Sequence, residues 1–350
     1  MLHSPITPPR AATIACEAGF SAALDEAAAG ADPRHAFLRR AWFQAAGGAA
    51  AVTLVSIGPD GRVLAALPTV ATGPRLLGIR AVPGSYWPLR SFPIAEDARD
   101  ADLAALLSHP ALGRAWRVGP VNADDPSASR LVGLARLLGW TVLERRIATS
   151  FVLDIGPARA AGPWPRSSTL KKNRFHEKHL AAHGALAWRF LSGADWTPAL
   201  FDALAQVEAA SWIGERPDAD AKFTAPRQRA IWEAAASDPL LAGAMHVGLL
   251  EVGGVPAAFS FGIEAGRTRY CIATSYDRRF AKHSPGKLVS YRTYLDAADR
   301  GISFFDDGAG DGGHKSVMGE TPGPEIMDYL FVRGRALAAV LRPLWARSGR

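Results

Sequence analysis

The sequence predicts an α/β fold made of two similar units. The chain has 350 residues, which is long for one domain and comfortable for two. Hydrophobic residues make up 48% and charged residues 21%, a composition that supports buried sheets and argues against long disorder. Two apolar hairpins, beginning at Val52 and Val247, share strand lengths and turn position, so we expect one α/β unit to be duplicated.

Periodicity predicts the elements of the first unit in order. Apolar residues recur at helical spacing over residues 35–46. The strands VTLVSI and RVLAALPTV follow, joined by a Gly-Pro-Asp-Gly turn. Proline and glycine then crowd residues 73–93, which predicts irregular structure. Further helices are expected at 98–107 and 127–138, and strands at 115–119 and 140–155.

A Gly-Pro-rich segment, residues 156–166, is interpreted as a linker between domains at 1–155 and 167–350. A long basic helix at 168–183 follows it. The remaining expected elements are a strand at 186–191, helices at 197–211 and 226–236, the hairpin from 246 to 266, a strand at 269–276, a helix at 285–300, strands at 302–307 and 327–332, and a helix at 335–346.

Composition also limits the partners and the compartment. Forty Lys and Arg against 33 Asp and Glu give a net charge of +7, so an anionic partner is open. The two cysteines, Cys16 and Cys271, lie far apart without CxxC spacing, so neither a disulfide framework nor a metal site is expected. The first residues lack the apolar core of a signal peptide, and the longest apolar run, 45–58, is too short for a membrane span. We expect a cytoplasmic protein.

The stretch YDRRFAKHSPGKLVSY, residues 276–291, predicts a helix start suited to phosphate. Ser284 has the chemistry of an N-cap, Pro285 fits the first helical position, and Gly286 lets a ligand approach the backbone. The alternative is an ordinary capped helix with a solvated basic rim. The candidate ligands are the amides of Gly286, Lys287 and Leu288, the Ser284 hydroxyl, and the side chains of Arg278, Arg279, Lys282 and Lys287.

This stretch and its continuation, AADRGISFFDDGAGDGGHKSVMG, resemble the tandem-domain CelD-like (cellulose-biosynthesis) acetyltransferases of the GNAT superfamily, relatives of the Fem-type aminoacyl transferases. The chain departs from that pattern with Asp307 in place of an aromatic residue and His314 in place of tyrosine. The resemblance covers residues 166–335 well and the N-terminal half in outline. The matching positions are Tyr276, Asp277, Ser284, Pro285, Gly286, Gly301, Asp306, Gly308, Gly310 and Lys315.

The resemblance implies tandem GNAT-like domains, each a mixed, mostly antiparallel sheet flanked by helices. It also implies an N-acyltransferase with no permanently bound cofactor, whose cosubstrate is acyl-CoA or the phosphopantetheine of an acyl carrier protein. The acceptor would be an amine of an envelope sugar or of a long-chain amino alcohol. The first domain would be degenerate, with an acceptor-binding or structural role, and the pantetheine amides would pair with the strand at 271–276.

Attack of a neutral amine on a thioester needs a base, a donor for the oxyanion and an acid for the thiolate. We expect Asp306 to be the base, while Asp307 either raises its pKa or caps the glycine-rich turn. His314 is a second candidate base or proton shuttle, Lys315 would orient an acyl carbonyl or a carboxylate, and Tyr276 would protonate the thiolate. Structural explanations stay open for these three: a surface histidine, a solvated lysine and a tyrosine at the sheet rim.

Two other readings are open. A Fem-like aminoacyl transferase using charged tRNA would need a broad basic groove, so nucleic acid is not expected from a net charge of +7. A degenerate, non-catalytic binding module fits the departures at Asp307 and His314. Lys171, Arg174 and Lys178 form a basic stripe that would hold an anion or face solvent. The amphipathic C-terminal segment, 328–350, is interpreted as packing on the sheet, with peripheral contact at the inner face of the membrane left open, as is the oligomeric state.

Overall fold

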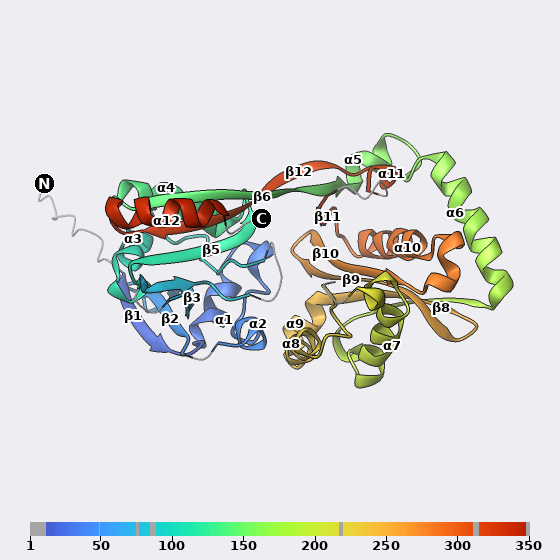
Figure 1. Ribbon diagram of the computed structural model, residues 1–350, viewed down its shortest axis with the longest axis horizontal. Coiled ribbons are helices and arrows are strands. Elements are labelled where there is room, and N and C mark those ends of the chain that lie inside the picture. Colours follow the sequence, from blue (N-terminus) through green and yellow to red (C-terminus); the bar gives the residue numbers. More distant parts are fainter. Residues whose placement is uncertain are drawn as a thin grey trace, which may run out of the picture.

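The computed structural model describes residues 12–48, 50–74, 77–84, 89–216, 220–310 and 315–347. Two halves lie side by side and are joined along one edge by two long strands, β6 and β12 (Figure 1). The first half comprises β1 (Thr13–Ala18), α1 (Ala23–Ala29), η1 (Pro33–His35), α2 (Arg40–Ala46), β2 (Val52–Ile57), β3 (Val63–Thr72), β4 (Ile79–Ala81), α3 (Asp100–Ser108), η3 (Pro110–Leu112), β5 (Ala115–Asn122), α4 (Pro126–Leu137) and β6 (Thr141–Asp154).

The second half begins inside the expected linker, where the Asp154 carboxylate accepts the Gly156 amide and starts a short helix. Its elements are α5 (Ile155–Ala160), α6 (Ser167–Leu180), η4 (Ala181–His183), β7 (Leu186–Leu191), η5 (Gly193–Asp195), α7 (Pro198–Ala209), η6 (Trp212–Glu215), α8 (Pro226–Ala236), α9 (Pro239–Ala244), β8 (Met245–Val252), β9 (Val255–Ala265), β10 (Thr268–Tyr276), η7 (Arg278–His283), α10 (Pro285–Asp299), β11 (Phe304–Ala309), α11 (Lys315–Met318), β12 (Thr321–Val332) and α12 (Arg335–Arg347).

The strands form one twelve-stranded sheet in the order β1-β2-β3-β4-β5-β12-β6-β11-β10-β9-β8-β7. From one edge of the sheet to its centre the order is β1 to β5 and then β12. From the other edge to the centre the order is β7 to β11 and then β6, which is the same pattern. The fourth and fifth strands of each half are parallel, and the other neighbours are antiparallel. The halves therefore repeat one topology and exchange their last strands, and the expected duplicated, mixed, mostly antiparallel fold is confirmed.

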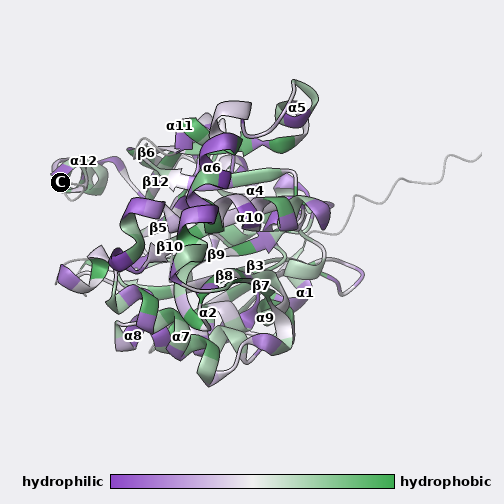
Figure 2. Cartoon of the chain, turned by 90° about the vertical axis from the view of Figure 1, so that its right-hand side faces the viewer, coloured by the Kyte–Doolittle hydropathy of each residue, from purple (hydrophilic) through white to green (hydrophobic). Residues whose placement is uncertain are grey.

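Helices cover both faces of the sheet in the second half. Helices α6 and α10 lie on one face and α7, α8 and α9 on the other (Figures 1 and 2). Helix α6 carries mostly hydrophilic residues, whereas the strands beneath it are largely apolar (Figure 2). Among the described residues, no helix combines the length and the apolar character needed to cross a membrane.

One hydrophobic core runs through both halves. The rings of Trp42 on α2 and Trp232 on α8 lie 6.0 Å apart, and Phe37 lies 6.3 Å from Tyr270 on β10. Trp42 and Trp232 are almost completely buried. Aromatic contacts therefore hold the halves against each other on the side opposite β6 and β12, and fix the geometry of the surfaces between them.

Candidate active site

Two strands diverge in the middle of the second half. The parallel strands β10 and β11 pair from Thr268–Phe304 to Tyr270–Asp306, where the pairing ends. Just beyond, β10 shifts register against β9 between Cys271 and Ala273. Strand β11 likewise shifts register against β6 between Asp306 and Ala309. These irregularities turn the two strands away from each other, so beyond Tyr270 and Asp306 the edges of β10 and β11 that face each other are unpaired.

A cavity of about 590 Å³ occupies the divergence on the α10 side. Its wall is formed by β10 from Cys271 to Tyr276, the first turns of α10, the end of β11 and α11. We refer to it as the α10 cavity. Of the residues predicted from the sequence, Tyr276, Gly286, Lys287 and Lys315 line it. Four of the predicted residues therefore lie together at one cavity.

The first turn of α10 differs from the expected cap. Ser284 adopts a left-handed conformation, with φ 51° and ψ 46°, and its side chain makes no cap hydrogen bond, so the predicted hydroxyl cap is wrong. Pro285 does occupy the first helical position. Gly286 is buried against Tyr276, because a Cβ at Gly286 would lie 3.0 Å from the tyrosine Cδ1. The Leu288 amide donates to the Ser284 carbonyl at 3.2 Å and its side chain is buried, so Leu288 does not belong among the candidate ligands.

The predicted basic residues divide into two groups. Arg278 pairs with Glu215, and Arg279 donates to Asp277 from Nε at 2.8 Å and from Nη2 at 2.6 Å. Both arginines are more than half exposed, so they stand at the rim in ion pairs rather than inside the cavity. Lys282 lies in η7, and Lys287 lines the α10 cavity, as does Lys315.

Four histidines surround the start of α10, a cluster that sequence reasoning missed. His183 and His283 bring their Nε2 atoms within 3.1 Å, and His179 lies next to His283. Burial and then the charge of Lys282 lower the pKa of His283. Burial and then the charge of Lys287 lower the pKa of His176. Lys282, Lys287 and the N-terminus of α10 thus create a positive potential around these histidines. The cluster is not a metal site, because within the described part of the chain no group of three or more His, Cys, Asp or Glu side chains is arranged to hold a metal.

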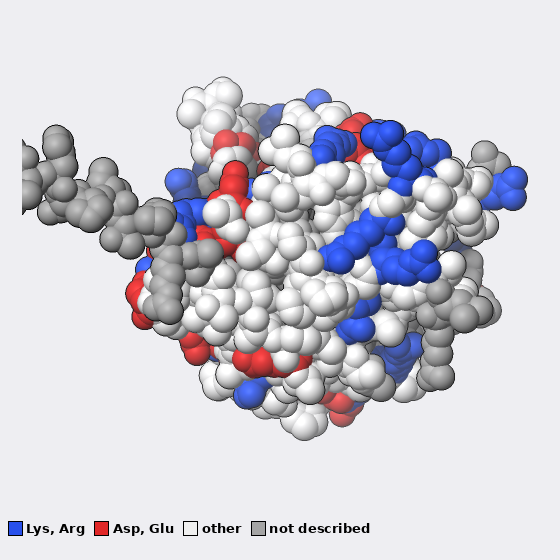
Figure 3. All heavy atoms as spheres, turned by 90° about the vertical axis from the view of Figure 1, so that its left-hand side faces the viewer, with Lys and Arg blue, Asp and Glu red and all other residues white. Residues whose placement is uncertain are grey.

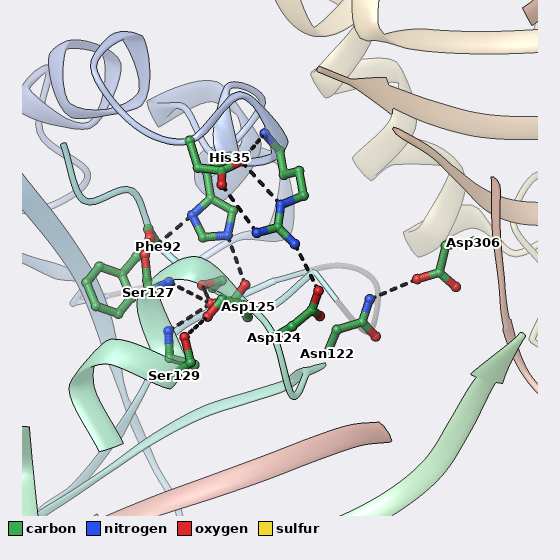
Figure 4. Close-up of polar contacts among 12 residues, drawn as sticks. His35, Phe92, Asn122, Asp124, Asp125, Ser127, Ser129 and Asp306 are labelled. Carbon is green, nitrogen blue, oxygen red and sulfur yellow. Dashed lines mark hydrogen bonds and ion pairs between the residues drawn. The ribbon is translucent and has the colours of Figure 1, made fainter. Parts of the chain in front are cut away.

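Asp306 lies on the face of β11 that points away from the α10 cavity. It belongs to the last residue pair, Tyr270–Asp306, before β10 and β11 diverge. Its carboxylate accepts hydrogen bonds from Asn122 Nδ2 at 2.8 Å, from the Gly308 amide at 2.9 Å and from Ser150 Oγ. Burial raises the pKa of Asp306, although these hydrogen bonds favour its ionised form. Figure 4 shows Asn122 reaching across from the first half to this carboxylate. A buried carboxylate with a raised pKa is suited to act as a general base.

Asp306 faces a second cavity, of about 560 Å³, between the halves. Its walls come from η1, the end of β5, β6, the turn from β9 to β10, β11 and β12. On the η1 side, Arg34 is held by Asp32 at 3.2 Å and by Asp124 at 3.1 Å. We refer to it as the inter-half cavity. Because alternate residues of a strand face opposite sides, Asp306 borders this cavity while Asp307 borders the α10 cavity.

The remaining predicted catalytic residues have different surroundings. Asp307 accepts a hydrogen bond from the Tyr294 hydroxyl, and burial raises the pKa of Tyr294. Lys315 Nζ donates to the carbonyls of Asp307, Gly308 and Ala309 at 2.7, 2.9 and 3.1 Å. Its ammonium thereby holds the last residues of β11. His314 lies outside the described residues, so its predicted role stays a prediction.

The equivalent position in the first half is unsuited to an anion. Helix α3, which follows β4 as α10 follows β10, begins with two acidic residues. The Asp102 carboxylate accepts the Arg99 amide at 3.0 Å and is 1% exposed. Elsewhere in the first half, His35 pairs with the buried Asp125, the N-cap of α4, at 2.9 Å (Figure 4), and Asp125 also accepts hydrogen bonds from Ser91 Oγ and the Ser127 amide. These groups bond to one another within the first half, so the start of α10 in the second half stays the predicted phosphate site.

Comparisons with known proteins concern the family and the fold. Residues 167–316 match the family model described as an acetyltransferase (GNAT) domain. The fold resembles that of FemX, with 12% identity, a TM-score of 0.59, and coverage of 86% of this chain and 93% of that one. It resembles a conserved protein of unknown function from Bacteroides thetaiotaomicron with 14% identity, a TM-score of 0.56 and coverages of 91% and 99%. L-PGS from Bacillus licheniformis gives 12% identity, a TM-score of 0.54 and coverages of 92% and 94%.

No curated protein matches the chain. The structural likenesses, at these identities, concern the fold alone. The family match concerns the part of the chain that contains β10, α10 and β11, the elements that form the α10 cavity. The second half of this chain therefore contains a GNAT-superfamily acetyltransferase domain, set in a two-unit fold.

Proposed function

We propose that the protein is an acyl-CoA-dependent N-acyltransferase, with the acyl donor in the α10 cavity and an amine acceptor in the inter-half cavity. The observation that carries the proposal is the position of Asp306. Its carboxylate lies at the point where β10 and β11 separate, and the two cavities meet the strands on either side of that point. An acyl carrier protein would present the same phosphopantetheine arm.

The donor would bind through the backbone as much as through side chains. The amides of Gly286 and Lys287 have no earlier helical turn to bond to, so they can donate to the pyrophosphate at the positive end of α10. Lys287 adds charge at the cavity wall, and the cluster of four histidines lies in the same positive region. The pantetheine amides would bond to the unpaired edge of β10 as an added strand does.

The reaction follows from this placement. The neutral amine attacks the thioester carbonyl carbon, a C–N bond forms and the C–S bond breaks. Asp306 takes the proton that the nitrogen loses, and the departing thiolate takes a proton to leave as the free thiol of CoA. A positioned base of this kind contributes roughly 10²–10⁴-fold in rate. Tyr276 and Tyr294 both line the α10 cavity, and either hydroxyl would supply the proton to sulfur.

The first half would contribute acceptor contacts and support. In the first turn of its helix α3 the buried Asp102 carboxylate accepts the Arg99 amide and pairs with the Arg99 guanidinium, so this pair fills the position where a pyrophosphate would bind. At the outer end of this half, basic side chains gather on one side and acidic ones on the other (Figure 3). A net charge of +7 over 350 residues gives only weak support for a tRNA-binding groove, so we favour a small acyl donor over charged tRNA.

Calorimetric titration of the protein with CoA tests the donor site. Gly286→Val should weaken binding about 10- to 100-fold, the equivalent of about 1.5–3 kcal/mol for a lost charge-assisted hydrogen bond, because the new side chain displaces Tyr276 and covers the helix start. Gly133→Val is the matched control, since Gly133 is a helical glycine in α4 with open space around its Cβ position. Equal affinity of the two variants would move the donor elsewhere. Failure of the wild-type protein to bind CoA would overturn the proposed function.

A further inference from the structure

We propose that the inter-half cavity selects a primary amine carried on an apolar group, and that Asn122 of the first half binds the amine nitrogen together with Asp306. The inference rests on the proposed N-acyltransfer and names the acceptor class of that reaction. It follows from the composition of the cavity wall and from one buried amide group.

The wall of the inter-half cavity is largely apolar. Phe304 is 44% exposed, although an aromatic ring of this size is usually buried, and it borders the cavity together with Val152 and Pro324. Pro33 and the ring of Tyr270 close the opposite side. An exposed apolar wall inside a concave site is typical of a pocket for an apolar ligand.

The polar groups of the wall are mostly engaged already. Arg34 donates to Asp32 and Asp124, so its guanidinium is engaged. Arg267 is exposed, at the turn that forms the outer part of the wall. A sugar would bring several hydroxyl groups into contact with Phe304, Val152 and Pro324, where they would lose their water without gaining partners. The cavity therefore favours an alkyl or aryl amine over an amino sugar.

Asn122 supplies the specific contact at the inner end. Its Nδ2 donates to the Asp306 carboxylate at 2.8 Å, and because an ionised carboxylate can only accept, the orientation of the amide is fixed. Its Oδ1 is buried and has no hydrogen-bond partner among the described residues. An unsatisfied buried carbonyl is unfavourable, and an N–H of the ligand would satisfy it.

Asn122 and Asp306 both line the inter-half cavity, and we propose that an amine nitrogen bound there bonds to the Asp306 carboxylate and to the Asn122 carbonyl once the ligand makes that carbonyl accessible. A primary amine has N–H groups for both: one bonds to the carbonyl and the other is the proton that the base removes. An alcohol has a single O–H and would leave one acceptor unsatisfied. The first half therefore takes part in the reaction of the second half through β5, whose last residue is Asn122.

The test measures release of the CoA thiol from acetyl-CoA by the full chain, with octylamine, benzylamine, octanol and glucosamine as acceptors. We expect kcat/KM for the two apolar amines to exceed that for glucosamine and octanol at least 10-fold. Asn122→Leu should raise KM for octylamine at least 10-fold while the affinity for CoA, measured by calorimetry, stays unchanged. A preference for glucosamine, or an unchanged KM in Asn122→Leu, would overturn the inference.

A second pair of variants tests the wall independently. Phe304→Asp should lower kcat/KM for octylamine at least 10-fold, because it places a charge beside the alkyl chain. Phe190→Asp is the matched control, since Phe190 is 38% exposed on β7 and borders neither cavity. Equal activity of the two variants would contradict the apolar site. The absence of thiol release with every amine, despite CoA binding, would instead count against the proposed N-acyltransfer itself.

Discussion

Replacing Ser150 with alanine should raise the pKa of Asp306 and move the acid side of the activity profile to higher pH. Ser150 lies on β6 and donates its hydroxyl proton to the Asp306 carboxylate, a bond that stabilises the ionised form. Only the ionised carboxylate can accept a proton from the amine. The value of kcat/KM should therefore rise with pH through the pKa of Asp306 in the free enzyme, and the variant should need a higher pH to reach its plateau.

The size of the shift follows from the burial of the pair. Ser150 is completely buried and Asp306 is 5% exposed, so water does not replace the lost donor easily. A hydrogen bond to a charged group contributes about 1.5–3 kcal/mol, and one pKa unit corresponds to about 1.4 kcal/mol, so the acid side should move by about one to two pH units. Because Asn122 and the Gly308 amide still donate to the Asp306 carboxylate in the variant, we expect a pKa shift nearer one unit than two.

The assay is the pH dependence of thiol release with a weakly basic amine such as trifluoroethylamine, with kcat/KM calculated on the concentration of neutral amine so that protonation of the amine is removed from the profile. Ser56→Ala serves as the control, because Ser56 is equally buried and its hydroxyl bonds to a backbone carbonyl. We expect the control to keep the wild-type profile. An identical acid side in Ser150→Ala and Ser56→Ala would refute the assignment of Asp306 as the base.

Two further predictions concern buried titratable groups. Asp306→Asn should lower kcat/KM at least about 100-fold yet keep the free energy of unfolding at pH 7. Because the pKa of Asp306 is raised, its ionisation lowers the stability of the wild type as the pH rises above 3.8, and the neutral asparagine avoids that loss. A large decrease in the free energy of unfolding, measured with urea, would contradict this. Burial lowers the pKa of His246 on β8 from 6.5 to about 4, so the unfolded chain binds the proton more tightly than the folded chain does. The free energy of unfolding of the wild type should therefore fall by about 3 kcal/mol as the pH falls from 6.5 to 4. His246→Gln should show a flatter dependence in urea unfolding between pH 4 and 7, and parallel curves for the two proteins would refute the assignment.

The sequence was most informative where the signal is local. Alternation and turn residues predicted both hairpins, and the Pro285-Gly286 pair predicted the start of α10. The hydroxyl cap was wrong because an N-cap side chain reaches the helix amides from an extended backbone, whereas Ser284 is left-handed. That conformation is uncommon outside glycine and has no distinct sequence pattern.

Contacts between distant segments could not be predicted in the same way. Asn122 and Ser150 belong to strands that are 184 and 156 residues from Asp306, and no spacing rule joins them. Periodicity predicts that a segment is a strand but not which strand it pairs with, so the exchange of β6 and β12 had no signal in the sequence. The cavity between the halves has the same origin, since its walls come from six separate segments: η1, the end of β5, β6, the turn from β9 to β10, β11 and β12.

The exchange of β6 and β12 has a consequence for how the chain can be divided. A cut in the Gly-Pro-rich segment would leave each piece with the closing strand of the other: the C-terminal piece would carry β12, whose pairing with β5 covers residues 326–332, while β11 would lose its neighbour β6. Asp306 would then lie on a strand with an unpaired edge, and its carboxylate would lose the hydrogen bonds from Ser150 and Asn122 at the same time. The smallest piece of this chain that retains a complete base is therefore the chain with both halves, even though the family match ends within one of them.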